Sequence, residues 1–320
     1  MEVQKRKSNQ RRALLILSGL LFRQQICYAL RRFSLVHPGK TNPLSQPYPE
    51  ISTPDRLAVL TIAGFDPSSG AGVTADLKVF AAHRFYGVAA ITALTVQSTQ
   101  GVQRLEPLNP AMLADTLNCL ADDINITGVK IGMLAAAGAV TAVAHFLAGS
   151  GIPRERTVLD PVIRSSSGRA LLDAEGLGRL QGELLPQVGW LTPNLDELAE
   201  LVAHPVSGRD SIPKAAHALL SRYPGLNVVV TGGHLDAPDD FLLTSSGVEH
   251  WFAGRKIETA ATHGTGCTFS SALLCQLVSG LPGPEAVSAA KRYVRAAIEN
   301  AYPIGKGKGP LHHLYNLEKP

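Results

Sequence analysis

The chain has 320 residues, a length that fits one large α/β domain or two small ones. Its hydrophobic fraction of 45% is enough for a sizeable core, and its charged fraction of 18% is below that of an average protein. The first forty residues carry more positive charge than the whole chain's net +4, so the rest of the chain is slightly acidic and offers no expected surface for nucleic acid.

The cysteines give no sign of a metal site or of a disulfide scaffold. Cys27, Cys119, Cys267 and Cys275 lack metal-ligand spacing and are sparse for a chain of this length. A reduced, cytoplasmic protein is the simplest interpretation.

Residues 1–56 differ in composition from the rest. Basic residues precede and follow the apolar run 13–22, and five prolines follow between residues 38 and 54. The run is shorter than the roughly 20 residues that a membrane-spanning helix needs, and no clear signal-peptide cleavage site follows it. We therefore expect a disordered or weakly helical extension without stable membrane insertion, with a peripheral membrane anchor as the alternative.

From Leu57 onward, strands and helices are predicted to alternate. Short apolar runs predict strands, and apolar residues three and four positions apart predict helices. The expected strands cover residues 57–64, 88–96, 128–134, 157–162, 189–194 and 227–233, with an antiparallel hairpin over 241–253. The expected helices cover residues 72–84 and 195–203, segments around Leu117, Leu147 and Leu180, a helix that starts near Thr265, and a last one over 285–301.

Each expected strand is a continuous apolar run, which is typical of a mostly parallel sheet with helices on both faces. We therefore predict a single α/β domain over residues 57–320. Ligands of such sheets bind beyond the carboxyl ends of the strands. Glycines and polar residues follow those ends here: Gly64, Gln97, Met133, Asp160, Asn194 and the Gly232-Gly233 pair.

The segment 262–275, THGTGCTFSSALLC, predicts a glycine-rich turn that leads into a helix. Such a junction offers free backbone N–H groups and the positive end of the helix dipole, a combination that binds phosphate. Cys267 would stand in the first turn, where the same field is expected to lower the pKa of the thiol. The alternative is a close-packed helix entry with a small buried cysteine.

Two carboxylates come near the ends of neighbouring strands. Asp160 follows an apolar strand, and Glu197 lies three residues after Asn194. Together they could hold Mg²⁺ for phosphoryl transfer, or they could be a turn residue and a helix N-terminal charge. The chain lacks the motifs of P-loop proteins, of protein kinases and of Rossmann dinucleotide-binding folds.

Seven segments occur in an order that resembles the hydroxymethylpyrimidine/phosphomethylpyrimidine kinases of thiamine biosynthesis, which have the ribokinase-like fold. They are IAGFDPSSGAGVTADLK (62–78), ITALTVQSTQGV (91–102), VKIGML (129–134), VLDPV (158–162), LTPNLDE (191–197), TGGH (231–234) and THGTGCTFSSAL (262–273). The tail, PIGKGKGPLHHL (303–314), is also similar to that family, so the resemblance extends from about Leu57 to Leu314.

The resemblance implies a role for each matching residue. Asp76 and Gln97 would bind the pyrimidine edge, with Gly64, Met133 and Val162 lining the same pocket. Asp160 and Glu197 would serve Mg²⁺, while Asn194, Thr231 and Gly233 would contact ATP. Gly264, Thr265 and Gly266 would form the anion hole, with Cys267 as the base. His234 and His263 are expected to be structural.

The chain departs from the family pattern at two positions. Thr231 and Ser166 stand where the family often has lysine, so Arg164 or Lys256 is expected to face the phosphates instead. Lys306 and Lys308 belong either to a solvated tail or to a segment that closes over the nucleotide.

The implied function is ATP-dependent phosphorylation of hydroxymethylpyrimidine and then of its monophosphate. The alternatives are a pyridoxal kinase and a catalytically silent sensor of the pyrimidine phosphate. Retention of both Asp160 and Cys267 argues against the sensor. The expected partners are small molecules only, and the sequence leaves a homodimer open.

Overall fold

The computed structural model describes residues 56–165, 168–233, 235 and 237–317. The described fold lies within one unit, Asp55–Pro320. The extension predicted for residues 1–56, Arg56 apart, and the expectations for Ser166 and His234 therefore lie outside the described residues.

In the described part of the chain, nine strands form one sheet in the order β3-β2-β1-β4-β5-β6-β7-β8-β9. The strands are β1 (Ala58–Phe65), β2 (Tyr86–Ser98), β3 (Gly101–Pro107), β4 (Ile126–Ile131), β5 (Thr157–Leu159), β6 (Trp190–Leu191), β7 (Asn227–Val230), β8 (Asp240–Leu243) and β9 (Glu249–Phe252). The central strands from β2 to β7 pair in parallel, whereas β3, β8 and β9 are antiparallel to their neighbours.

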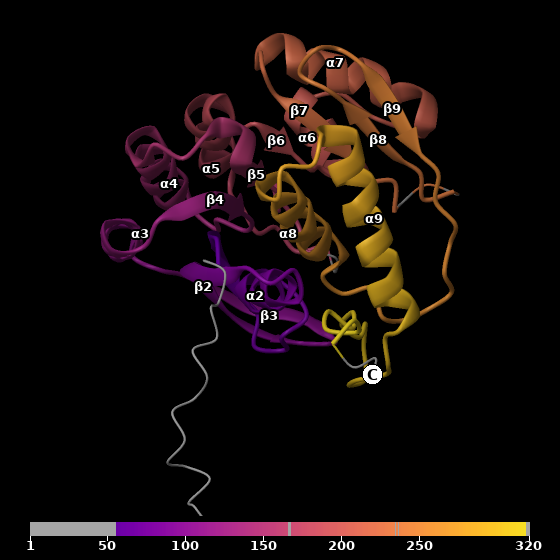
Figure 1. The fold of residues 1–320 in the computed structure, drawn as a ribbon, viewed down its shortest axis with the longest axis horizontal. Coiled ribbons are helices and arrows are strands. Elements are labelled where there is room, and N and C mark those ends of the chain that lie inside the picture. The colour runs from indigo at the N-terminus through magenta and orange to yellow at the C-terminus, as the bar shows by residue number, and fades with distance from the viewer. Residues whose placement is uncertain (1–55, 166–167, 234, 236, 318–320) are drawn as a thin grey trace, which may run out of the picture. The chain divides into compact units, whose positions relative to one another are not determined.

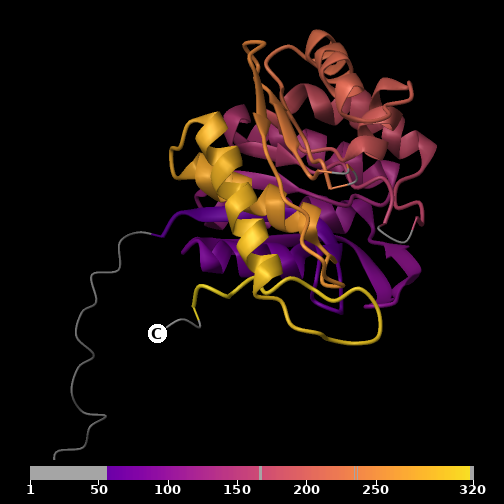
Figure 2. The ribbon, with the colours of Figure 1, turned by 90° about the vertical axis from the view of Figure 1, so that its right-hand side faces the viewer.

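Helices cover both faces of the sheet, and Figures 1 and 2 show α8 and α9 side by side on one of them. The helices are α2 (Gly72–Ala82), α3 (Pro110–Asp123), α4 (Ala137–Ser150), α5 (Ala174–Arg179), α6 (Leu195–Val202), α7 (Ile212–Arg222), α8 (Thr265–Val278) and α9 (Gly283–Glu299). Short helical turns lie at η1 (Arg154–Arg156), η2 (Leu180–Leu184), η3 (Leu185–Gln187) and η4 (Arg209–Ser211). None of these helices is both long and apolar enough to cross a bilayer.

Two cores result from the side-chain alternation of the strands. In β1, Val59 belongs to the core that includes residues of α2, α8 and α9, while Leu60 and Ile62 belong to the core that includes residues of α3, α4, α6 and α7. The structure thus confirms the predicted α/β class, with a mostly parallel sheet between two helical layers.

Strand β3 and helix α7 were not predicted from the sequence. Strand β3 is largely exposed and pairs with β2 through its backbone, so it lacks the apolar run by which the other strands were predicted. Helix α7 buries Ile212, Ala215, Ala216 and Leu219, which is the three- and four-residue spacing of an amphipathic helix. The spacing of these four residues is visible in the sequence and would have predicted α7.

We predict that a chain shortened to begin at Asp55 folds with an unchanged thermal midpoint, because β1 begins only at Ala58. Circular dichroism melting of the full and shortened chains would test this. A chain that begins at Gly64 is the control and should not fold, because β1 pairs with both β2 and β4 in the middle of the sheet. A lower midpoint for the Asp55 chain would mean that the removed residues stabilise the domain.

Candidate active site

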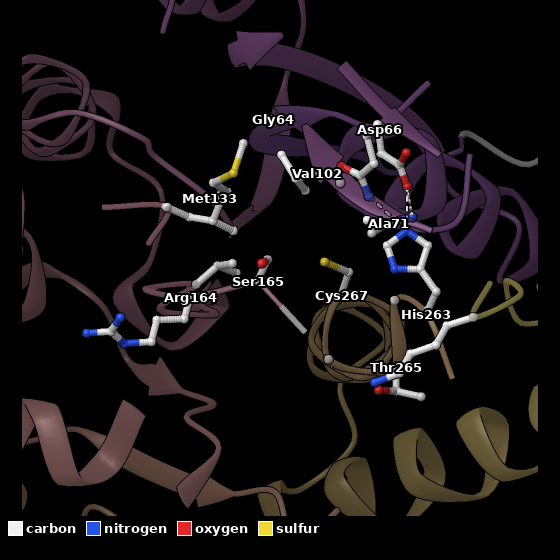
Figure 3. A pocket seen from close by; sticks show the side chains of 18 of the residues that line it. Gly64, Asp66, Ala71, Val102, Met133, Arg164, Ser165, His263, Thr265 and Cys267 are labelled. Atoms are coloured by element: carbon white, nitrogen blue, oxygen red, sulfur yellow. Dashed lines mark hydrogen bonds and ion pairs between the residues drawn. The ribbon is translucent and has the colours of Figure 1, made fainter. Parts of the chain in front are cut away.

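A cleft of about 720 Å³ lies beyond the carboxyl ends of the parallel strands. All of the predicted site residues except Asp76 line it: Gly64, Gln97, Met133, Asp160, Val162, Asn194, Glu197, Thr231, Gly233, Gly264, Thr265, Gly266 and Cys267. Figure 3 shows Met133, Cys267 and His263 around the same space, although they come from distant parts of the sequence. One cavity therefore holds both the expected heterocycle end and the expected phosphate end.

The phosphate end is built at the start of α8. Gly264 is the N-cap residue with φ of 85°, and a Cβ atom there would overlap the carbonyl oxygen of Gly70. The first helical hydrogen bond runs from the N–H of Thr268 to the oxygen of Gly264, at 2.9 Å. The amides of residues 265–267 precede that bond and are the donors that a helix start leaves without an intrahelical partner. They line the cleft and are suited to an anion.

Cys267 lies in this first turn and is partly buried, with the N–H of Gly72 hydrogen-bonded to its sulfur. Burial raises the pKa of its thiol to about 12, and the nearby Lys130 ammonium offsets only part of that effect. The expectation of a lowered thiol pKa was therefore wrong. Removal of the thiolate from water by surrounding segments outweighs the local field of the helix.

Asp160 and Glu197 stand together in the wall of the cleft, each about 5% exposed. Burial raises the pKa of both carboxyls. The Lys130 ammonium partly offsets this rise at Asp160, whereas the negative charge of Asp160 raises the pKa of Glu197 further. A Cβ atom at Gly266 would lie 3.6 Å from one Asp160 oxygen, so this carboxylate borders the anion site. Within the described residues, no group of three or more metal-binding side chains is present.

Asn194 lines the cleft, and its side chain also caps the N-terminus of α6. Its Oδ1 accepts from the N–H of Glu197 at 2.9 Å, and a Glu197 oxygen accepts from the N–H of Asn194 at 3.0 Å. This capping box fixes the Glu197 side chain at the N-terminus of α6. Thr231 follows β7 and pairs with Asn194 through an isolated bridge, which brings the expected nucleotide residues side by side.

At the heterocycle end, Gly64 leaves room for Met133, because a Cβ atom on Gly64 would overlap the Met133 side chain. The Gln97 side chain lies 3.1 Å from His263, and His263 in turn lies 2.7 Å from Asp66; neither of these two cleft residues was expected to bind a ligand. His263 does make structural hydrogen bonds, as predicted, but it also faces the cleft. Asp66 follows β1 directly, and its place at the end of a predicted strand was the available signal.

The structure contradicts the role predicted for Asp76. Its side chain is fully buried on α2, outside the cleft, and both carboxylate oxygens contact the Lys130 ammonium at 2.9–3.0 Å. Thr61 and Ser271 also donate to it, at 2.6 and 2.8 Å. Burial, the largest single effect, would lower the pKa of Lys130, but the charges of Asp76, Cys267 and Asp160 and the hydrogen bond with Asp76 together raise it. Asp76 is therefore one half of a buried ion pair and not a pyrimidine ligand.

The two cations proposed to replace the missing lysines have different outcomes. Arg164 lines the cleft, is 54% exposed and forms an ion pair with Glu200 at 3.6 Å. Lys256 is exposed and does not line the cleft. Lys308, which precedes the Gly309 oxygen that accepts from the N–H of His263, does line it.

The sequence is similar to the phosphomethylpyrimidine kinase family over residues 66–312. A hydroxymethylpyrimidine/phosphomethylpyrimidine kinase of Streptomyces coelicolor is 40% identical over 274 residues, covering 86% of this chain and 99% of that protein. The fold is similar to phosphomethylpyrimidine kinase from Clostridium difficile, with 33% identity, a TM-score of 0.67, and coverage of 76% of this chain and 100% of the other. Pyridoxal kinase from Staphylococcus aureus, in complex with AMP-PCP and pyridoxal, gives 27% identity and a TM-score of 0.74, with 82% and 96% covered.

We predict that Asp76→Asn lowers the free energy of unfolding by about 3–5 kcal/mol, because it leaves the buried Lys130 charge without its partner. Urea denaturation would measure this, and the double variant Asp76→Asn/Lys130→Met should recover part of the loss. The folded fraction of Asp76→Asn should bind the heterocycle nearly as well as the unmodified chain. A variant of unchanged stability that has lost heterocycle binding would contradict the structural role.

Proposed function

The chain belongs to the phosphomethylpyrimidine kinase family, and from this premise we propose that its cleft transfers phosphate from ATP to hydroxymethylpyrimidine and then to the resulting monophosphate. The observation that carries the proposal is the single cleft that joins the heterocycle end to the amides of α8 and the two carboxylates. The products serve thiamine biosynthesis. The free thiols of Cys119, Cys267 and Cys275 support a cytoplasmic location.

In the first step, the hydroxymethyl oxygen forms a bond to the γ-phosphorus of ATP, and the bond from that phosphorus to the ADP oxygen breaks. The amides of residues 265–267 would stabilise the charge on the transferring group. The hydroxyl proton would pass to Cys267. In the second step, a phosphate oxygen of the monophosphate attacks a second ATP in the same way, and this nucleophile carries no proton that must be removed.

Asp160 and Glu197 fit a magnesium ion, because they offer two carboxylate ligands in the cleft wall whose pKa values are raised mainly by burial, so that a bound cation would stabilise their charged forms. These two carboxylates would hold the ion, which would supply positive charge to offset the negative charge of the ATP phosphates. Asn194, Thr231 and Gly233 would bind the nucleotide beside these carboxylates, and Arg164 and Lys308 would supply cationic groups at the open side of the cleft.

The direct test is to incubate the full chain with ATP, Mg²⁺ and either hydroxymethylpyrimidine or pyridoxal, and to separate the mono- and diphosphorylated products. We expect both pyrimidine products and slower turnover of pyridoxal. Phosphorylation of pyridoxal alone would favour the alternative kinase, and binding of the pyrimidine phosphate without turnover would favour the sensor.

We predict that Cys267→Ala lowers the rate of the first phosphorylation by about 10²-fold or more, as expected for loss of a positioned base, and the second much less. Because the thiol pKa is raised to about 12, the thiolate fraction increases with pH throughout the neutral range. The first-step rate should therefore rise with pH in the unmodified enzyme and lose this rise in Cys267→Ala. Cys119→Ala, which alters an exposed thiol, is the matched control. Equal losses in both steps would exclude Cys267 as the proton acceptor.

We predict that Asp160→Asn weakens the dependence of the rate on Mg²⁺ while heterocycle binding stays nearly intact. Initial rates over a magnesium titration and calorimetric titration with the heterocycle would measure the two quantities. Asp115→Asn, at an exposed position on α3, controls for the loss of a surface charge. Loss of heterocycle affinity with an unchanged magnesium titration would show that Asp160 belongs to the other end of the cleft.

A further inference from the structure

The contacts of Asp66 show that its carboxylate is a pure hydrogen-bond acceptor. One oxygen accepts from the N–H and the hydroxyl of Ser68 at 2.8 and 2.6 Å, and the other from the N–H groups of Gly70 and Ala71 at 3.1 and 2.9 Å. Burial would raise the pKa of this carboxyl, but the hydrogen bonds from His263 and Ser68 outweigh burial and lower it. Asp66 is therefore ionised at neutral pH and carries no proton to donate.

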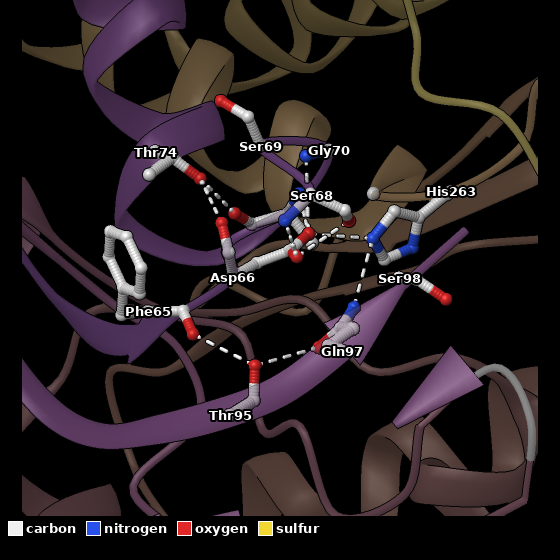
Figure 4. A network of polar contacts seen from close by, with 12 residues as sticks. Phe65, Asp66, Ser68, Ser69, Gly70, Thr74, Thr95, Gln97, Ser98 and His263 are labelled. Atoms are coloured by element: carbon white, nitrogen blue, oxygen red, sulfur yellow. Dashed lines mark hydrogen bonds and ion pairs between the residues drawn. The ribbon is translucent and has the colours of Figure 1, made fainter. Parts of the chain in front are cut away.

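His263 must then carry a proton on Nε2. That nitrogen lies 2.7 Å from an Asp66 oxygen, a distance that requires a donor between two electronegative atoms. With its proton directed at Asp66, Nε2 has no lone pair left for a second donor. The Gln97 side-chain nitrogen nevertheless stands 3.1 Å from the same atom, so that two N–H groups face each other (Figure 4).

The side-chain oxygen of Gln97 also lies beside an atom with which it cannot form a hydrogen bond, because here two acceptors meet. The hydroxyl of Thr95 donates its single proton to the carbonyl oxygen of Phe65 at 2.9 Å. It therefore has no proton for the Gln97 oxygen, which lies 3.2 Å away. Exchanging the oxygen and nitrogen of the amide, which have nearly the same shape, resolves both conflicts at once. The oxygen then shares the Nε2 proton of His263 with Asp66, as the longer arm of a bifurcated hydrogen bond, and the nitrogen donates to the hydroxyl oxygen of Thr95.

We propose that His263 is a positioning residue that holds the Gln97 carbonyl oxygen toward its imidazole, so that Gln97 presents an N–H group to the cleft and recognises a hydrogen-bond acceptor on the heterocycle. One N–H of the amide is used by Thr95, and the second has no partner among the described residues. The identity of the heterocycle, an aminopyrimidine whose ring nitrogens are acceptors, rests on the proposed function. A free glutamine amide offers both a donor and an acceptor, but this network leaves only the donor for the ligand.

The protonation state of His263 tests the arrangement without any substrate. Long-range ¹⁵N–¹H correlation spectra of the full chain, assigned by comparison with His263→Phe, report which ring nitrogen carries hydrogen. We expect a protonated Nε2, whether the ring is neutral or charged. A neutral ring with hydrogen on Nδ1 alone would overturn the proposal, and this result does not depend on which reaction the protein catalyses.

A comparison of substrate analogues tests whether Gln97 donates to a ring nitrogen of the heterocycle. The kcat/KM of hydroxymethylpyrimidine is compared with that of the two analogues in which one ring nitrogen is replaced by C–H. The unmodified enzyme should disfavour one analogue by roughly tenfold, the effect of one lost hydrogen bond in a buried site. In Gln97→Leu this discrimination should disappear, and in His263→Phe it should fall by at least about threefold because the amide is free to turn.

His145→Phe, on the exposed surface of α4, is the matched control and should keep the discrimination of the unmodified enzyme. If His263→Phe does not fold, His263→Gln takes its place; its terminal N–H can still meet Asp66 or Gln97, so it should retain part of the discrimination. Unchanged discrimination in His263→Phe would overturn the positioning role. An unmodified enzyme that phosphorylates none of the three pyrimidines would instead refute the proposed function, and the ¹⁵N experiment would still decide the arrangement.

Discussion

A buried ion pair between Asp76 and Lys130 joins the elements that build the cleft. Asp76 comes from α2 and Lys130 from β4, and the hydroxyls that complete the network, those of Thr61 and Ser271, come from β1 and α8. Both charged side chains are fully buried, so removing either one would leave the other charge buried without a partner, at a large cost in free energy. This pair therefore ties the helix that carries the anion site to the strands that carry the heterocycle site.

The same network sets the electrostatics at the cleft. The positive charge of Lys130 is shared among Asp76, Asp160 and Cys267, but only Asp76 is in direct contact with it. Asp160 and Cys267 consequently remain poorly compensated, and burial raises the pKa of both. An environment of this kind favours ligands that bring their own positive charge, which is how a magnesium–nucleotide complex would bind.

The two ends of the cleft are built from different groups, backbone amides at one end and side chains at the other. The candidate phosphate end consists of amides at the start of α8, where close contact with the backbone at Gly70 leaves no room for a side chain at Gly264. The heterocycle end consists of side chains whose hydrogen bonds are mutually dependent, from Asp66 through His263 to Gln97 and Thr95. Under the proposed function, recognition of the phosphate charge would rely on the backbone, while recognition of a particular heterocycle would rely on the polarity of a single amide.

Much of the architecture was determined by the sequence alone. Continuous apolar runs predicted the parallel sheet, and because parallel strands end at one edge, residues as distant as Gln97, Asp160 and Asn194 were expected in one place. The glycine-rich segment 262–275 likewise predicted a helix start that faces an anion. These features depend on local composition and periodicity, and they hold whatever the details of packing. Strand β3 has no such local signal, because its pairing partner supplies the order.

Only the tertiary structure decided which polar side chains face the cleft and in what state. Asp66 and Asp76 lie ten residues apart in the same motif, yet the rotation of α2 against β4 and α8 buries Asp76 beside Lys130, while the loop before α2 turns Asp66 to the cleft. Segments remote in sequence also bury the Cys267 thiol and reverse the pKa shift expected from its helix position. The orientation of the Gln97 amide depends on His263, 166 residues away. Such properties arise from desolvation and from hydrogen bonds between distant residues, which no local pattern encodes.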